Sequence, residues 1–502
     1  MDDELNARYK DSIMAILIYF ILYVIVHGCM AMRLGLAVEE AKFAREIDWC
    51  LLCNGRWGIQ LFRLLTFSND YLPFSAGIVA GVFISLAIHI QTLLFNIKSV
   101  ITKFLYAAFY VGCVQWVYQL RYSNQSHAVA FAILLITGAV YILYNCHQYR
   151  YVLVSLFMTC WAIGTYQTLI LYMAELIIVA ELFRFGTDSE QGAFYRIFRA
   201  IAVLVGGFVL CFIISKAIIH FVKIPIHTVK FVDEYQGNMV GWFSRDSINI
   251  KDLFVYIIWL PLRNLLGKNY HGQYHIISAI IPAIILVVQY VRKMRLASTC
   301  KGICYIGLML YIPFSMGAIL LWGGGTRLNI AEPMVAASLW ALASQRVGFF
   351  KVVKIKYALI IISAYSVILG SARSAEFARD EGWSFQRSSD ELMMMYLRGQ
   401  QAAMVEGTPD CRIVLLGNIR SHSGYFYDVE REGYRLHEPN PDILRNAGWL
   451  DDYKRFLRLP RLIMGSANDM QKHKECFNTL TIWPADNSVK ANKGEVIIRI
   501  GE

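Results

Sequence analysis

The sequence predicts a polytopic α-helical membrane protein that carries a small α/β domain at its C-terminal end. Of its 502 residues, 57% are apolar and 17% are charged, and the mean hydropathy is +0.44. Soluble domains carry about 25% charged residues. The apolar residues also fall in blocks of about 16–25 residues, the length that crosses the hydrocarbon core of a bilayer. Residues 372–502 are instead polar, which indicates a domain outside the membrane.

Eleven apolar segments are the expected membrane spans. The first is not followed by a small-residue cleavage site, so it indicates a retained span rather than a removed signal peptide. A further stretch, 252–266, is interrupted by Pro261 and Arg263, which favours an interfacial or re-entrant helix. The eleven segments lie near 12–32, 74–95, 101–120, 128–146, 151–164, 167–183, 200–220, 276–291, 302–322, 333–347 and 356–371.

The basic residues predict the orientation of these spans. If the N-terminus is cytoplasmic, every second connection is rich in Lys and Arg, whereas the others are poor in both. The C-terminal domain then lies on the outer side. The net charge of +11 arises from the basic residues in these short connections rather than from a basic face with interleaved aromatic residues. No nucleic acid is therefore expected as a partner. The basic connections contain Lys98 and Lys103; Arg150; Arg184, Arg196 and Arg199; Arg292, Lys293, Arg295 and Lys301; and Arg346, Lys351, Lys354 and Lys356.

The predicted organisation is a transmembrane domain, 1–371, with outer loops 34–73 and 221–275, followed by the outer domain 372–502. In the outer domain, the sequences CRIVLLGN and EVIIRIG have the short β-branched runs that are typical of buried strands. Turn-rich segments separate these two runs. A disulfide between Cys411 and Cys476 is conceivable if this domain faces an oxidising space.

Two adjacent carboxylates, Glu39 and Glu40, follow the first span at the expected outer face. They fit a solvated loop that stabilises the N-terminus of the next helix. Alternatively, a carboxylate held near the low-dielectric boundary binds protons more readily and can act as a general base. Spacing alone is compatible with both interpretations. Glu46 and Asp48, one or two helical turns further along, are weaker candidates for the same role.

Two arginines lie at expected outer boundaries, Arg56 in the sequence NGRWG and Arg327 in WGGGTRLN. A lone arginine at such a boundary is commonly a snorkelling anchor. Two that face the same side, one of them after a glycine triplet with exposed backbone N–H groups, could clamp a phosphate. Lys223, His227 and Lys230 follow the seventh span and add positive charge, for which anionic lipid headgroups are an equally good partner.

Tyr166 and Gln167 interrupt the apolar run where the fifth and sixth segments meet. A buried Gln is costly unless it is hydrogen-bonded, so Gln167 either ties two helices together or faces a polar cavity. Glu175, inside the sixth segment, is a further candidate for function. The sequence contains no nucleotide-binding loop or serine-hydrolase motif in its required context. No cofactor is predicted, and no convincing ligand set supports a divalent metal, because the Cys50-x-x-Cys53 pair has no second pair.

The order of these features resembles a known family. A first span, an acidic pair, fourteen intervening residues and Gly-Arg-Trp are followed by a span that opens with LPFS. The Tyr-Gln pair, the sequence TRLNIAEP and a closing IWPADNSVKANKGEVIIRI come later. Together they resemble the bacterial Gtr-type glucosyltransferases, which modify O-antigen and convert serotype. Relatives commonly have Asp-Asp where this chain has Glu39-Glu40, the same chemical group on a longer arm.

The resemblance implies an inverting glycosyltransferase of the GT-C type in the bacterial inner membrane, with its C-terminal domain in the periplasm. The expected donor is undecaprenyl-phosphate glucose and the expected acceptor is a lipid-linked O-antigen, with a donor synthase and a flippase in the same pathway. Glu40, or Glu39 in its place, would be the general base. The residues expected to hold the substrates are Arg56, Arg327, Tyr166, Gln167, Asp48, Lys223 and His227.

Three alternative functions remain open on the sequence. A GT-C enzyme could move another sugar from the same carrier. A transporter or flippase for a lipid-linked saccharide would also use charges within the membrane, but such proteins usually show paired repeats and broken helices in both halves. A structural subunit of an envelope assembly is the non-enzymatic alternative. Sugar identity, acceptor residue and linkage are not readable from the sequence.

Overall fold

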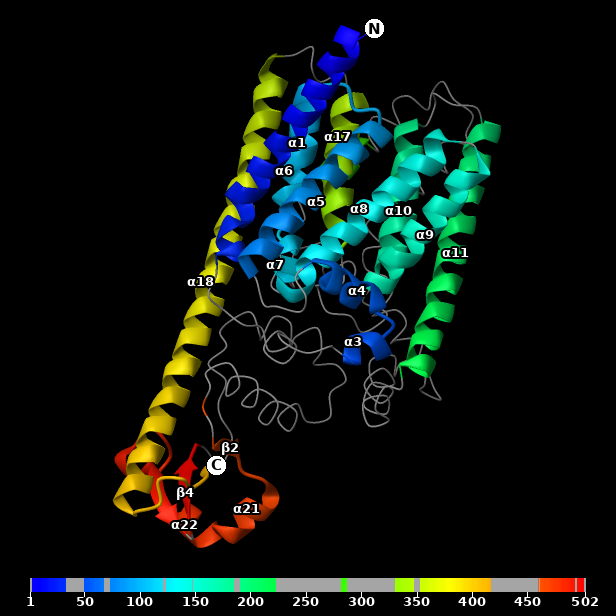
Figure 1. Ribbon diagram of the computed structural model, residues 1–502. Helices are drawn as coiled ribbons and strands as arrows, with labels where there is room; N and C mark the ends of the chain where they lie inside the picture. The colour runs from blue at the N-terminus through cyan, green and yellow to red at the C-terminus, as the bar shows by residue number, and fades with distance from the viewer. Residues whose placement is uncertain are drawn as a thin grey trace, which may run out of the picture. The chain divides into compact units, whose positions relative to one another are not determined.

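The computed structural model of the chain describes residues 2–32, 49–66, 73–120, 123–146, 148–184, 190–222, 281–286, 330–346, 353–416, 459, 461–492 and 494–500 (Figure 1). The chain divides into two compact units. The first comprises Met1–Met32 and Ile47–Glu376, and the second comprises Arg33–Glu46 and Phe377–Glu502.

The first unit is a helix bundle. Its longer helices are amphipathic only weakly, because most of their residues face either other helices or an apolar surrounding. The helices are α1 (Asp2–Ala31), α3 (Trp49–Cys53), α4 (Trp57–Thr66), α5 (Pro73–Leu94), α6 (Val100–Val111), α7 (Gln115–Leu120), α8 (Ser123–Asn145), α9 (Tyr149–Thr165), α10 (Leu169–Arg184), α11 (Glu190–Phe221), α17 (Glu332–Arg346) and the first part of α18 (Val353–Val405).

Among the described residues, five helices are long and apolar enough to cross a membrane, which confirms the membrane character of the chain. They match predicted segments, whereas α9 and α10 are shorter. Most of the predicted spans 276–291 and 302–322 lies outside the described residues. The five candidate spans are Tyr9–Ala31, Phe74–Leu94, Gln125–Asn145, Gly192–Phe221 and Tyr357–Arg379.

The predicted span 101–120 is not one helix. It ends as α6 at Val111 and resumes as α7 at Gln115. The carbonyl of Val111 accepts a hydrogen bond from Nε2 of His27 at 2.8 Å, and a Cβ on Gly112 would lie 2.7 Å from the carbonyl oxygen of Ser366. Helices α1 and α18 therefore contact the break directly, and these tertiary contacts explain why an apolar run with helical composition does not continue as one helix.

A buried polar network ties α5, α6, α8 and α10 together around Gln91. The amide Nε2 of Gln91 donates to Oγ1 of Thr137 at 3.1 Å and to the hydroxyl of Tyr172 at 2.6 Å. Its Oε1 accepts from the hydroxyl of Tyr106 at 2.5 Å, and the Tyr110 and Tyr172 hydroxyls lie 3.1 Å apart. Because both atoms of this amide are bonded inside an apolar bundle, the network fixes how the four helices align.

One end of the bundle is basic. Arg184 and Arg196 lie over the ring of Tyr144, at 5.0 and 5.6 Å from its centre, and Arg196 pairs with Glu181 at 3.1 Å. Arg199 donates to a main-chain carbonyl just after α8 at 2.9 Å. These arginines belong to one of the connections for which the sequence predicted a cytoplasmic position.

The opposite end of the bundle holds three short helices, α3, α4 and α7 (Figure 1). Both α3 and α4 lie within 34–73, the region that the sequence predicts as an outer loop between two spans. Ile59 and Phe62 of α4 are buried and pack with Leu51 of α3 and Ala128 of α8. Burial of this apolar face explains why the region is helical.

The second unit contains a mixed four-stranded sheet in the order β2-β1-β4-β3. Strand β1 (Ile413–Leu416) pairs in parallel with β2 (Leu462–Met464) and β4 (Glu495–Arg499), and β3 (Val489–Asn492) pairs antiparallel with β4. The two runs predicted as buried strands are β1 and β4. Helix α18 continues without interruption through residue 372, where the sequence suggested that the outer domain begins.

Both faces of this sheet are covered, so its central strands are apolar throughout. Ile413 and Leu415 face the end of α18, where they pack with Leu392 and Met395. Val414 and Leu416 face the other way, toward α22 (Lys474–Thr479). The short helix α21 (Ala467–Lys472) precedes α22.

The disulfide that the sequence left open between Cys411 and Cys476 is absent, because both thiols are free. Cys411 packs with the residues on the α18 face of the sheet, whereas Cys476 packs with those on the α22 face. The sheet lies between the two side chains, and a disulfide requires Cβ atoms about 4 Å apart.

Candidate functional site

The sequence NGRWG forms a tight turn between α3 and α4. The N–H of Gly55 donates to the carbonyl of Leu52 at 3.0 Å, and the N–H of Arg56 donates to that of Leu51 at 2.8 Å. This pair of bonds is the Schellman motif, which ends a helix with a left-handed residue. Gly55 has φ of 73°, a conformation that glycine adopts without strain. The turn projects Arg56 from a fixed backbone, immediately before Trp57 starts α4.

Close packing of two glycines holds this turn against the end of α9. A Cβ on Gly58 would lie 2.4 Å from Oγ1 of Thr165 and 2.8 Å from its backbone nitrogen. A Cβ on Gly164 would lie 2.4 Å from the ring of Trp57. The start of α4 and the end of α9 therefore touch through backbone and ring atoms, which sets the position of Arg56 relative to the residue that follows α9.

That next residue is Tyr166, and Arg56 stacks on it. The guanidinium carbon of Arg56 lies 4.8 Å from the centre of the Tyr166 ring, within the range of a cation–π contact. Nε of Arg56 is buried and has no hydrogen-bond partner among the described residues. Arginine N–H groups in such surroundings favour an anionic acceptor with which they can form charge-assisted bonds.

Gln167 ties the two turns together. Its Nε2 donates a short hydrogen bond to the backbone carbonyl of Asn54, immediately before Gly55. Ser215 of α11 completes the contact, since a Cβ on Gly55 would lie 3.2 Å from its Oγ and 3.3 Å from Nε2 of Gln167. Of the two roles that the sequence left open for Gln167, the structure favours the connection between helices.

The structure thus brings together three residues that the sequence singled out, Arg56, Tyr166 and Gln167, from two distant turns. Sequence reasoning did not identify Asn54 and Ser215 as their neighbours, although the Asn-Gly pair was a visible turn signal. The other predicted site residues lie outside the described part of the chain, so their placement stays a prediction: Glu39, Glu40, Asp48, Lys223, His227 and Arg327.

In the part of the chain that the structure describes, no group of three or more His, Cys, Asp and Glu side chains is arranged to hold a metal ion. What the turn offers is a positively charged, planar group beside an aromatic ring and an amide. Such a group can bind a phosphate and stabilise charge that develops on it.

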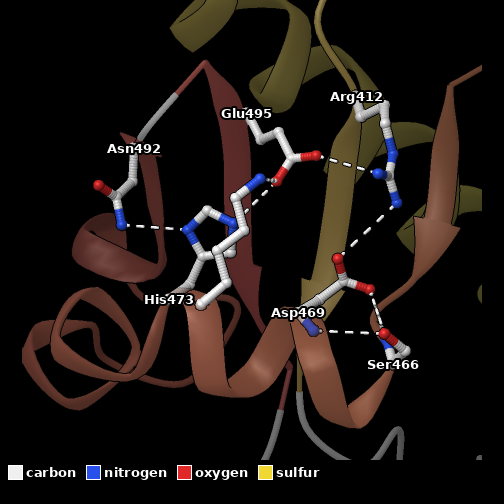
Figure 2. Close-up of polar contacts among 7 residues, drawn as sticks. Arg412, Ser466, Asp469, His473, Asn492 and Glu495 are labelled. Carbon is white, nitrogen blue, oxygen red and sulfur yellow. Dashed lines mark hydrogen bonds and ion pairs between the residues drawn. The ribbon is translucent and has the colours of Figure 1, made fainter.

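A second polar cluster lies in the C-terminal unit, around Glu495 (Figure 2). The Glu495 carboxylate accepts hydrogen bonds from Lys472 at 2.7 Å and from Nε2 of His473 at 2.8 Å, and it pairs with Arg412 at 3.1 Å. Nδ1 of His473 accepts a bond from the amide of Asn492 at 3.1 Å. Both ring nitrogens are therefore occupied, which indicates a structural role rather than proton transfer.

Electrostatics in this cluster favour the charged carboxylates. Burial alone would raise the pKa of Glu495, but the bonds from Lys472 and His473 and the charge of Arg412 outweigh it, so the pKa lies below its ordinary value. Hydrogen bonds from Ser466 lower the pKa of Asp469, and Ser466 in turn caps α21 by accepting a hydrogen bond from the backbone N–H of Asp469. The cluster anchors α21 and α22 to the amino ends of β1 and β4.

Comparison with known proteins bears on the first unit. The family described as glucosyl transferase GtrII matches residues 36–342, which include both turns of the candidate site and end before α18. No curated protein matches the chain. The match covers more than half of the sequence, in agreement with the resemblance noted from its motifs. The chain is therefore a glycosyltransferase and belongs to the glucosyl transferase GtrII family.

Proposed function

We propose that the chain transfers glucose from undecaprenyl-phosphate glucose to a lipid-linked O-antigen at the periplasmic face of the inner membrane. The observation that carries this proposal is Arg56, which stacks on Tyr166 and has a buried Nε with no partner among the described residues. A guanidinium so held suits the phosphate of a prenyl-linked donor. The family match supports the transfer of glucose.

The proposed topology follows from charge. The N-terminus lies in the cytoplasm, residues 1–371 form the GT-C-like transmembrane domain, and residues 372–502 form the periplasmic domain. The basic cluster of Arg184 and Arg196 around Tyr144 supports a cytoplasmic position for that end of the bundle. The turn with Arg56 lies at the other end, where a donor with its tail in the bilayer can present its phosphate.

The proposed reaction is a single displacement. Glu40, or Glu39 in its place, takes the proton of the acceptor hydroxyl, whose oxygen forms a bond to C1 of glucose from the face opposite the phosphate. The bond between C1 and the phosphate oxygen breaks, and undecaprenyl phosphate leaves with the electron pair. Arg56 and Arg327 stabilise the charge on that phosphate, and inversion at C1 follows.

Purified protein incubated with labelled undecaprenyl-phosphate glucose and lipid-linked O-antigen tests the function. We expect labelled glucose in the acceptor, and we expect its transfer to fall at least about a hundredfold when the base is replaced, as Glu40→Gln or Glu39→Gln. Full activity in both variants would refute the base assignment. Transfer only from a different polyprenyl-phosphate sugar would correct the donor, and movement of intact lipid-linked saccharide without transfer would make the chain a transporter.

A further inference from the structure

Buried glutamines gather at the end of the bundle that holds α3, α4 and α7. Among the described residues, Gln60 on α4, Gln115 and Gln119 on α7, and Gln125 at the start of α8 are buried there, whereas Gln91 lies within the bundle. Gln115 and Gln119 are one helical turn apart, so they share a face of α7. Amides are costly in an apolar environment, and their concentration at one end requires an explanation.

Gln119 differs sharply from Gln91. Its side chain is 4% exposed, and its Oε1 is buried without a hydrogen-bond partner among the described residues. Gln91 is 0% exposed and uses both atoms of its amide, to Thr137, Tyr172 and Tyr106. A buried amide oxygen with no donor destabilises a fold, so natural proteins keep one where something else supplies the donor.

The surroundings of α7 indicate the class of ligand. The first turn of α8 contributes Gln125 and buried His127, whose ring centre lies 5.5 Å from that of Phe62 on α4. Helix α17, which packs on α7, begins at buried Glu332. A carboxylate repels phosphate but accepts bonds from hydroxyls. Neutral amides both donate and accept, as do the hydroxyls of a sugar.

We propose that α7 and the first turn of α8 form a subsite for the hydroxyls of a neutral saccharide, in which Oε1 of Gln119 accepts a hydrogen bond from the sugar. This inference rests on the proposed function and deepens it: Arg56 serves the donor phosphate, and Gln119 serves the acceptor saccharide. The two subsites lie on different helices of the same end of the bundle (Figure 1).

Gln119→Leu, with Gln91→Leu as its matched control, tests the subsite in the full-length protein in detergent. Each change replaces a buried amide with an apolar side chain of similar size. If Gln119 serves a ligand, Gln119→Leu leaves the thermal midpoint unchanged or raises it, because an unsatisfied oxygen is removed. Gln91→Leu lowers the midpoint, since it breaks a satisfied network.

Binding is measured with the saccharide released by mild acid from the lipopolysaccharide of the producing organism. We expect this probe to raise the thermal midpoint of the wild type and of Gln91→Leu but not that of Gln119→Leu. In transfer assays, we expect Gln119→Leu to raise KM for the acceptor about tenfold, because one hydrogen bond to the acceptor is lost. KM for the donor should stay unchanged.

Three results would overturn the subsite: a midpoint that falls in Gln119→Leu as it does in Gln91→Leu, a saccharide shift that survives in Gln119→Leu, or no shift in the wild type. Failure of the proposed function gives a different pattern. A saccharide shift that depends on Gln119, without any transfer from undecaprenyl-phosphate glucose, refutes the donor and keeps the subsite. Normal transfer with an unchanged acceptor KM in Gln119→Leu refutes the subsite and keeps the proposed function.

Discussion

The guanidinium carbon of Arg56 lies over the ring of Tyr166, 4.8 Å from its centre, although the two residues belong to turns far apart in the chain. A stack of this kind is worth about 0.5–2 kcal/mol and orients the planar group. The geometry separates two properties of Arg56, its charge and its planarity, which substitutions can remove one at a time.

Arg56→Lys keeps the charge but loses the planar fork and the stack, so we expect kcat/KM for transfer to fall about tenfold to a hundredfold. Arg56→Ala should lose more. Tyr166→Phe keeps the ring and should stay within about twofold of the wild type, whereas Tyr166→Leu should fall about tenfold. Transfer assays normalised to folded protein measure these effects, and a fully active Arg56→Lys would contradict the stacked phosphate-binding role.

Gln167 offers a test of positioning against substrate binding. Gln167→Leu removes the hydrogen bond to the carbonyl of Asn54, and the loss of one such bond costs about 0.5–1.5 kcal/mol. We therefore expect the thermal midpoint and the activity to fall together. The measurements are a thermal melt and a transfer assay on the same preparation. Loss of activity at an unchanged midpoint would show instead that the amide contacts substrate.

Gly58 tests whether close packing sets the site. Gly58→Ala would bring a Cβ within 2.8 Å of the backbone nitrogen of Thr165, so the start of α4 must move. We expect activity to fall by more than about tenfold and folded protein to decrease. Gly28→Ala is the control, because its Cβ meets only a Val24 methyl at 3.6 Å in the helix α1. Helix propensity predicts an unchanged or slightly stabilised Gly28→Ala.

Sequence reasoning recovered the helices that are continuous and apolar, such as α1, α5 and α8, because length and hydropathy determine them locally. It did not recover the break after Val111, which depends on α1 and α18 contacting it from distant parts of the chain. The domain boundary that it placed at residue 372 lies within the continuous helix α18, close to Phe377, where the second unit resumes. Along α18 the side chains change from mostly apolar to mostly polar, but the backbone remains helical.

The candidate site shows the same division. Arg56, Tyr166 and Gln167 stood out because each is polar at the margin of an apolar run. Their proximity could not be inferred, since it depends on Gly58 and Gly164 fitting against Thr165 and Trp57. Glycine composition suggests close approach in general, but it does not name the partner surface. Gln119 was missed because one glutamine in an apolar run looks like an ordinary helix residue.

The ion cluster around Glu495 leads to a prediction about pH. Because the folded pKa of Glu495 lies below the value of 4.5 expected in the unfolded chain, the carboxylate stabilises the fold above that unfolded pKa. This contribution is lost as the pH falls through the folded pKa. Glu495→Gln should therefore destabilise the C-terminal unit by about 1–2 kcal/mol at pH 7, because it weakens the bonds from Lys472 and Arg412, whose side chains are half-exposed and remain solvated.

Hydrogen exchange of peptides that cover β3 and β4, in the full-length protein, measures this effect. We expect faster exchange in Glu495→Gln than in the wild type at pH 7, and the difference should shrink as the pH falls below about 4.5, because the wild type then protonates the same group. Glu475→Gln, an exposed carboxyl on the neighbouring helix, should match the wild type throughout. A difference that persists unchanged at pH 3 would mean that packing, rather than charge, accounts for the role of Glu495.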